Sequence, residues 1–179
     1  MLSFGKVKAL QVMVKFKDLW NNHPLNRSER YPCRMGGFPT YRNQCAIRMS
    51  IALKEAGVTY NQMPRGLAQC KAHPKEAMHY IRAEELGRAL NRASIPGIGK
   101  AEILKNPKNY YRDLFGRTGI VLIRNYWFRK GEKKFPSGDH IDVWNGSRTA
   151  SAWLINWFFW AGYYGGYEKA SEIWFWEVK

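Results

Sequence analysis

The order in which helical and extended patterns follow one another is the strongest constraint on the fold of this chain. Apolar residues recur at helical spacing in its first half, over residues 7–20, 45–56 and 83–93. Later on the pattern changes to short β-branched or alternating runs, at 119–123, 139–144 and 173–178. Helices followed by strands, without regular alternation of the two, predict an α+β fold.

The composition supports a folded chain with a substantial core. Of the 179 residues, 45% are hydrophobic, and they include 8 Trp, 10 Tyr and 9 Phe. A disordered chain is poor in aromatic residues and cannot bury enough apolar surface, so that class is excluded. Since no repeat, low-complexity segment or long linker interrupts the sequence, we predict a single domain over residues 1–179.

The chain is strongly basic, with a formal net charge of +15. Such an excess favours encounters with polyanions, which include nucleic acids, anionic lipids and the bacterial cell wall. The Lys and Arg residues are spread along the sequence and form no dense run, which is typical of a solvated surface. Charge therefore indicates a class of partner without identifying one.

Neither of the two segments that could concern a membrane has the required pattern. Residues 1–19 mix four lysines among apolar residues, so we expect no Sec signal peptide. The uncharged stretch Thr149–Tyr167 approaches spanning length, but Asn156 and several glycines and tyrosines interrupt it. We interpret it as a buried or interfacial aromatic segment and expect no stable membrane insertion.

Three cysteines leave an odd thiol, because they cannot all pair within one chain. Cys33 and Cys70 can bridge in an oxidising compartment and leave Cys45 free, although spacing alone does not establish this pairing. Cys70, His73 and His79 are residue types that bind zinc. Since no fourth ligand occurs at a standard spacing, we expect no metal site.

Cys45 lies where a nucleophile would be expected. It follows a loop and begins an amphipathic helix that Asn43 can cap. Unpaired backbone N–H groups and the helix dipole stabilise a thiolate there, and the same N–H groups can hold the oxyanion of an attacked acyl group. Gln44, directly before Cys45, is a candidate for a supporting or oxyanion-binding role.

His140 is the candidate base for Cys45. It lies on an alternating strand that places His140, Asp142 and Trp144 on one face. Cysteine on an early helix and histidine on a later strand is the order found in papain-like enzymes. Asp142 can accept a hydrogen bond from the imidazole and fix its tautomer. Asn145 is a weaker candidate, because Asn-Gly at 145–146 is typical of a turn.

The sequence around these residues matches a known pattern. The segment NQCAIRMSIALKEAGV, followed later by GDHIDVWNGS and a closing IWFWEV, resembles the fourth family of type VI secretion amidase effectors. The segment GRTGIVLI is similar to the strand that precedes the histidine strand of that family. The resemblance extends loosely over residues 16–178 and closely over the two catalytic motifs.

The resemblance implies a papain-like fold, with N-terminal helices packed on an antiparallel sheet, and cysteine chemistry without a metal or cofactor. It implies hydrolysis of the amide between D-glutamate and meso-diaminopimelate in peptidoglycan stem peptides. It also implies a cognate immunity protein, and delivery to the periplasm of a target bacterium without a signal peptide. Nucleic acid is not an expected partner on this interpretation.

The third catalytic residue departs from the family pattern. Members can carry an aspartate about a dozen residues after the histidine, but SRTASAW, at 147–153, contains no acid here. We therefore predict Asp142 as the residue that orients His140. The catalytic set expected from the sequence is Cys45, His140 and Asp142.

Two alternatives remain open at this point. A papain-like amidase of another substrate class, such as a phage lysin or a protease, would share Cys45 and His140. A basic, aromatic-rich nucleic-acid-binding protein would stack bases on its aromatic side chains and would not need Cys45 beside His140.

Overall fold

The fold is built on one antiparallel sheet of four strands, seen in a computed structural model that describes residues 12–104, 106–152 and 166–179. The strands run in the order β3-β6-β4-β5. Their bounds are β3 Glu102–Leu104, β4 Gly119–Trp127, β5 Gly138–Trp144 and β6 Glu172–Glu177. Strand β5 therefore lies at one edge of the sheet, which positions it next to the helices.

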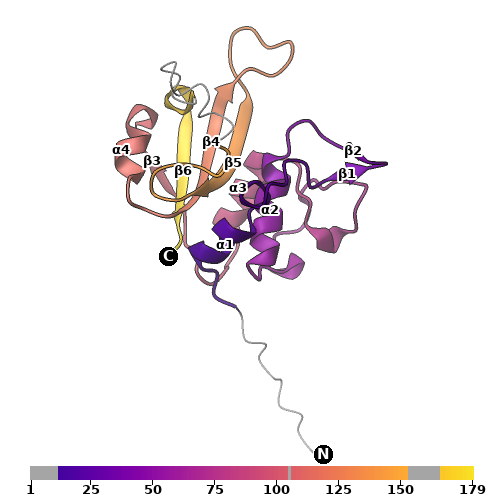
Figure 1. The fold of residues 1–179 in the computed structure, drawn as a ribbon. Helices are drawn as coiled ribbons and strands as arrows, with labels where there is room; N and C mark the ends of the chain where they lie inside the picture. The colour runs from indigo at the N-terminus through magenta and orange to yellow at the C-terminus, as the bar shows by residue number, and fades with distance from the viewer. Residues whose placement is uncertain (1–11, 105, 153–165) are drawn as a thin grey trace, which may run out of the picture.

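The helices of the first half gather beside that edge (Figure 1). They are α1 Phe16–Asn22, α2 Cys45–Glu55 and α3 Ala83–Arg92, and α2 and α3 both pack against β5. A fourth helix, α4 Tyr110–Leu114, lies on the opposite side of the sheet (Figure 1).

Short elements complete the described chain. A small hairpin, β1 Arg34–Met35 with β2 Phe38–Pro39, precedes α2. Single 3-10 turns form at η1 Pro24–Arg27, η2 Tyr60–Gln62, η3 Lys75–Ala77, η4 Pro107–Asn109 and η5 Tyr167–Lys169.

The alternation of side chains along β4 and β5 separates two apolar cores. Ile120 and Leu122 of β4 and Ile141 of β5 point into the larger core, which also holds the buried faces of α2 and α3. Val121 and Trp144 point the other way, into a smaller core with α4 and η5. Since successive strand residues face opposite sides, His140 and Asp142 share the side of Trp144, as the sequence predicted.

Most expected elements are confirmed, with changes at their ends. The first helix begins at Phe16 and runs to Asn22, beyond the predicted end at residue 20; residues 1–11 lie outside the described part. The strand predicted at 119–123 continues to Trp127, because its last residues pair with β5 across a register shift. Neither β3 nor α4 was predicted, because each is too short to show a period.

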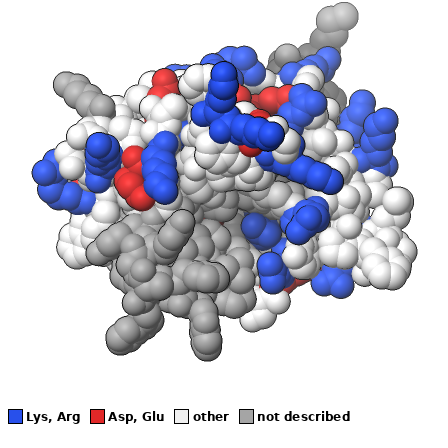
Figure 2. Space-filling view, turned by 90° about the horizontal axis from the view of Figure 1, so that it is seen from above, with Lys and Arg blue, Asp and Glu red and all other residues white. Residues whose placement is uncertain are grey.

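The interpretation of Thr149–Tyr167 as a buried aromatic segment stays a prediction, because residues 153–165 lie outside the described part of the chain. Among the residues that the structure describes, no helix is long and apolar enough to cross a bilayer. The basic side chains lie in several separate groups on the face shown in Figure 2, in keeping with their dispersed positions in the sequence.

Gly119 is required by the close approach of β4 to β6. A Cβ atom at Gly119 would lie 2.0 Å from the backbone oxygen of Trp176, whereas one at exposed Gly99 would meet nothing within 4 Å. We expect Gly119→Ala to lower the free energy of unfolding by about 2–3 kcal/mol through overpacking. Gly99→Ala, the matched control, should leave it nearly unchanged. Urea denaturation of both variants measures the difference, and equal stabilities would contradict this account.

Candidate active site

Cys45 is the first residue of α2, and its side chain is nearly buried. Its backbone N–H donates to Asn43 Oδ1 at 3.1 Å. The N-cap position is Gln44 and not Asn43 as predicted, so Asn43 supports the start of the helix from one residue before the cap. Burial opposes a charged thiolate, but a hydrogen bond with His140 and the positive charges of His140 and Arg48 outweigh it. Together they lower the pKa of Cys45 below its ordinary value.

His140 lies on β5 with its imidazole held on one side by two oxygen atoms. Nε2 is 3.2 Å from Asp142 Oδ2 and 3.0 Å from Ser151 Oγ. Nδ1 is therefore the ring nitrogen left for Cys45. Burial disfavours the imidazolium, but the electrostatic effects of Tyr167 and Tyr126 and the hydrogen bonds with Asp142 and Cys45 raise the pKa of His140 well above its ordinary value.

The pKa values of Cys45 and His140 shift in opposite directions, and both shifts have the same consequence. A lowered cysteine pKa and a raised histidine pKa both favour a thiolate–imidazolium pair at neutral pH. The thiolate is the nucleophilic form of cysteine. The arrangement of Cys45 and His140 can therefore carry out acyl transfer without a separate activating base.

Asp142 is a buried carboxylate whose oxygens are all engaged. Oδ1 accepts from the N–H of Val143 at 2.8 Å, and Oδ2 accepts from the N–H of Ser151 at 2.9 Å. His23 Nε2 lies 3.4 Å from Oδ1. Burial alone would favour the neutral acid, but His23 and His140 hold the pKa of Asp142 well below its usual range. The group is therefore a fixed acceptor for the imidazole.

His23 is a site residue that the sequence did not reveal. It joins α1 to η1 and lies beneath Asp142 with 1% of its surface exposed. Burial lowers the pKa of His23 to about 4, despite the attraction of Asp142. His23 is thus neutral at pH 7 and can donate one N–H to the carboxylate. A single histidine before Pro24 carries no sequence pattern that would have identified it.

Ser151 comes from the stretch 147–153, in which the family pattern leads one to expect an aspartate. Its hydroxyl lies at His140 Nε2, and its backbone N–H donates to Asp142. The side chain of Thr149 lies within 3.3 Å of the same hydroxyl. This segment therefore still supports the imidazole of His140, although the carboxylate is that of Asp142, two residues after His140 on β5.

Gln44 and Asn145, the two weaker candidates from the sequence, form hydrogen bonds that stabilise neighbouring loops. Gln44 is buried, and its Oε1 accepts from the N–H of Cys33 at 2.9 Å while its Nε2 donates to the carbonyl oxygens of Cys33 and Tyr41. Its side chain has no donor left for an oxyanion, so its role is to brace the preceding loop. Asn145 Oδ1 accepts from the N–H groups of Ser147 and Arg148 and stabilises the turn after β5.

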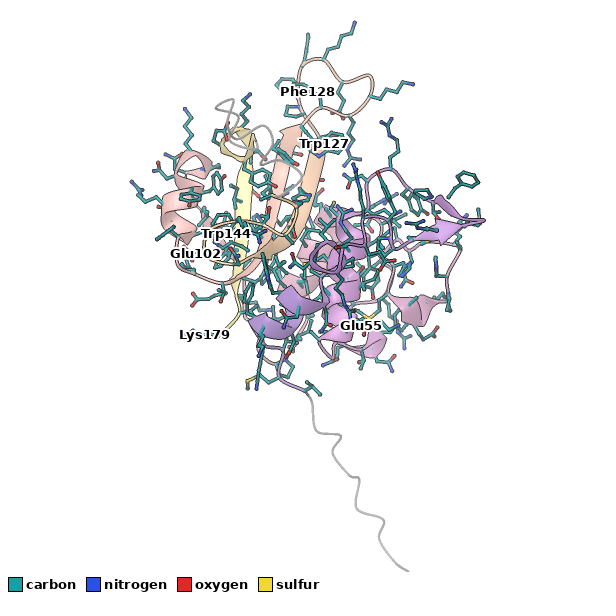
Figure 3. All side chains as sticks on the ribbon, in the orientation of Figure 1. Glu55, Glu102, Trp127, Phe128, Trp144 and Lys179 are labelled. Atoms are coloured by element: carbon teal, nitrogen blue, oxygen red, sulfur yellow. The ribbon has the colours of Figure 1, made fainter. Side chains whose placement is uncertain are left out.

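Two cavities lie beside the Cys45–His140 pair. One, of about 370 Å³, is lined by Cys45, and the other, of about 330 Å³, by His140. Asn43 and Trp127 line both. Figure 3 shows Trp127 at the end of β4 that leads into the β4–β5 loop. Because they share these walls, we interpret the two cavities as one groove beside the nucleophile.

The other two cysteines lie outside this groove. Cys33 and Cys70 are buried free thiols whose sulfur atoms are 3.1 Å apart. The expectation that no metal site is present depended on a missing fourth ligand beside Cys70, His73 and His79. The structure places Cys33 in that position.

A family model for "Type VI secretion system (T6SS), amidase effector protein 4" matches residues 41–176, which include Cys45, His140 and Asp142. The chain belongs to this amidase effector family. The family identity predicted from the sequence is therefore confirmed. A search among curated protein sequences found no match.

Solved structures with the same fold are effectors of this family. The effector–immunity system Tae4/Tai4 from Salmonella typhimurium matches with 23% identity and a TM-score of 0.52, covering 78% of this chain and 76% of that one. A complex of the Salmonella typhimurium effector Tae4 with the immunity protein Tai4 from Enterobacter cloacae matches with 22% identity and a TM-score of 0.52, covering 76% and 83%. The predicted α+β, papain-like fold is thereby confirmed, and the family identifies an amidase, hence a hydrolase.

Asp142 and Asn145 of this effector give a matched test of the third catalytic position. We expect Asp142→Asn to lower kcat/KM on the order of 100-fold or more, because the imidazolium loses its carboxylate. The pKa of His140 should fall, so the alkaline limb of the pH–rate profile should move to lower pH. Asn145→Ala should change kcat/KM by roughly twofold at most. Near-wild-type activity in both variants would remove Asp142 from the mechanism.

His23 makes the stability of the effector depend on pH. Its folded pKa of about 4 lies below the unfolded value near 6.5, so the unfolded chain takes up the proton first. This contribution is complete above pH 6.5 and is lost as the pH falls to 4, at a cost of about 3 kcal/mol. We expect His23→Gln to flatten the unfolding free energy over that range relative to the wild type. Parallel pH curves from urea denaturation would contradict the assignment.

Proposed function

We propose that this effector is a cysteine amidase that cleaves the D-glutamate–meso-diaminopimelate amide of peptidoglycan stem peptides. The observation that carries the proposal is the contact between Cys45 and His140 beside two cavities that share walls, in surroundings that lower the pKa of Cys45 and raise the pKa of His140. The membership of the amidase effector family supports hydrolysis of an amide. Cys33 and Cys70 also lie near a histidine, His73, but neither of these cysteines lines the two cavities.

The reaction proceeds in two steps through a thioester. The Cys45 thiolate attacks the amide carbon, and the negative charge moves to the carbonyl oxygen. The imidazolium of His140 then gives its proton to the amide nitrogen, the C–N bond breaks and the amine leaves. Neutral His140 then takes a proton from water, and the resulting hydroxide attacks the thioester. The tetrahedral intermediate collapses, which releases the carboxylate product and restores the thiolate–imidazolium pair.

The oxyanion formed in each step lies next to the start of α2. The first backbone N–H groups of a helix lack helical partners and are therefore available to an oxyanion at this end of α2. The N–H of Cys45 donates to Asn43 Oδ1 in this structure, and an oxyanion would replace that acceptor. Asp142 keeps the proton on Nε2, so Nδ1 faces the nucleophile and the leaving amine.

The cavity beside Cys45 is lined by charges of both signs. Arg82 pairs with Glu85, and Arg129 pairs with Asp139. Both arginine side chains are more than half exposed, so a carboxylate of the substrate can compete for them. The free α-carboxylate of D-glutamate in the proposed substrate is a group of the kind that a guanidinium binds.

The proposal also covers the protein partner of this effector and the compartment in which it acts. The solved relatives are described as complexes of the effector with an immunity protein. We infer a cognate immunity protein for this effector and action in the periplasm of a target bacterium. The net charge of +15 would favour its association with the anionic cell wall there.

Digestion of purified sacculi tests the proposal directly. We expect the protein to release muropeptides from Gram-negative sacculi that are cut between D-glutamate and diaminopimelate, as identified by mass spectrometry. Cys45→Ala should abolish cleavage because no nucleophile remains, whereas Asn145→Ala should retain it.

Three outcomes would contradict parts of this proposal. Cleavage that persists in Cys45→Ala would exclude the cysteine mechanism. Cleavage at another bond would keep the mechanism and refute the substrate assignment. If no sacculus were digested by the wild-type protein, the substrate class would be wrong.

A further inference from the structure

A second cluster of reactive side chains lies apart from the catalytic groove. Cys33 precedes β1, Cys70 and His73 precede η3, and His79 precedes α3. The cysteine sulfurs and one ring nitrogen of each histidine all lie within 4.8 Å of one another. Three separate stretches of the chain therefore meet at one point through residues that bind transition metals.

The distances within the cluster are close to those of a tetrahedral site. His73 Nδ1 is 3.6 Å from Cys33 Sγ and 3.6 Å from Cys70 Sγ. Ligands bound to tetrahedral zinc at usual lengths are separated by about 3.6 Å for sulfur and nitrogen and about 3.8 Å for two sulfurs. The two sulfurs here are 3.1 Å apart and would have to separate by about 0.7 Å around an ion.

The backbone holds these ligands in place. The N–H of Cys70 donates to the carbonyl oxygen of His79 at 2.9 Å, which closes the loop that carries His73. The N–H of Ala72 donates to Cys70 Sγ at 3.4 Å. Hydrogen bonds of this kind to a ligand are typical of the outer shell of a metal site, because they orient the ligand.

The cluster is buried, and one polar group in it is unsatisfied. Cys33, Cys70 and His79 are 0%, 3% and 8% exposed, and the two cysteines pack against Ile47. His79 Nδ1 is buried without a hydrogen-bond partner. An unpaired buried imidazole nitrogen costs stability unless another interaction satisfies the ring.

We propose that Cys33, Cys70, His73 and His79 form a structural site for Zn²⁺. Two thiolates and two neutral imidazoles are a standard ligand set for tetrahedral zinc. Binding would release the two thiol protons, and the two thiolate charges would then neutralise the ion. All four positions are taken by the protein, so the site leaves no place for a substrate and differs from a catalytic zinc centre.

The site is connected to the nucleophile through one residue. The N–H of Cys33 donates to Gln44 Oε1 at 2.9 Å, and Gln44 Nε2 donates to the carbonyl oxygen of Cys33 at 2.8 Å. Gln44 directly precedes Cys45 at the start of α2. An ion at Cys33 would thus fix the loop that positions the nucleophile, without touching any reacting atom.

Metal analysis of the full-length protein tests this proposal. After purification under reducing conditions with zinc present, we expect one zinc per chain by elemental analysis. Replacing zinc with Co²⁺ should give the intense visible absorption of a tetrahedral ion and thiolate-to-metal charge transfer in the near ultraviolet. Removing the metal with a chelator should lower the Tm, and adding zinc should restore it.

Two variants assign the ligands. His73 is the least buried of the four, so His73→Ala should fold and should bind Co²⁺ on the order of 100-fold more weakly, or worse. Cys45→Ala, the matched control, removes the third cysteine and should retain one zinc and the full cobalt spectrum, although it should not cleave sacculi. These readouts do not depend on whether the proposed amidase activity is correct.

Several results would overturn the proposal. One is less than stoichiometric zinc in reduced protein, or cobalt without a tetrahedral spectrum. Another is His73→Ala binding the ion as tightly as the wild type does. A third is a Cys33–Cys70 disulfide, found by mass spectrometry in protein kept with zinc, because the same two sulfurs cannot serve both bonds.

Discussion

The site depends on one buried chain of charges, from Asp142 through His140 to Cys45. Each member is stabilised in its charged form by its neighbours in the chain, with further support from His23 at Asp142 and from Tyr126 and Tyr167 at His140. Burial disfavours every isolated charge, yet the hydrogen bonds and attractions along the chain reverse that effect for all three groups. An isolated charge at any of these positions would shift toward its neutral form.

The edge strand of the sheet, β5, and the helix beside it position the three charged residues. Strand β5 presents His140 and Asp142 on one side and apolar residues on the other, while α2 packs beside it and begins at Cys45. The turn that follows β5 returns Ser151 to the same place, and His23 closes the far side of the carboxylate. Three distant stretches of sequence, at His23, at Cys45 and at 140–151, thus fix a constellation only a few ångströms across.

The same logic extends outward from the nucleophile. Both polar atoms of the Gln44 side chain form hydrogen bonds with the loop at Cys33 and Tyr41. Cys33 is also one of the four residues of the second cluster. A mobile loop would blur the position of Cys45, because catalysis is sensitive to displacements of about 1 Å. The rigidity of the first turn of α2 is therefore built from contacts that are themselves remote from the reaction.

The sequence by itself determined the helices and strands long enough to show a period, the family, and the pairing of Cys45 with His140. It also placed Asp142 on the correct strand face, because strand alternation is a local rule. Only the tertiary structure decided that His23 and Ser151 support Asp142, that Gln44 braces a loop, and that Cys33 completes a cluster with Cys70, His73 and His79. Most of those contacts join different segments of the chain, and no local periodicity encodes which segments a folded chain brings together.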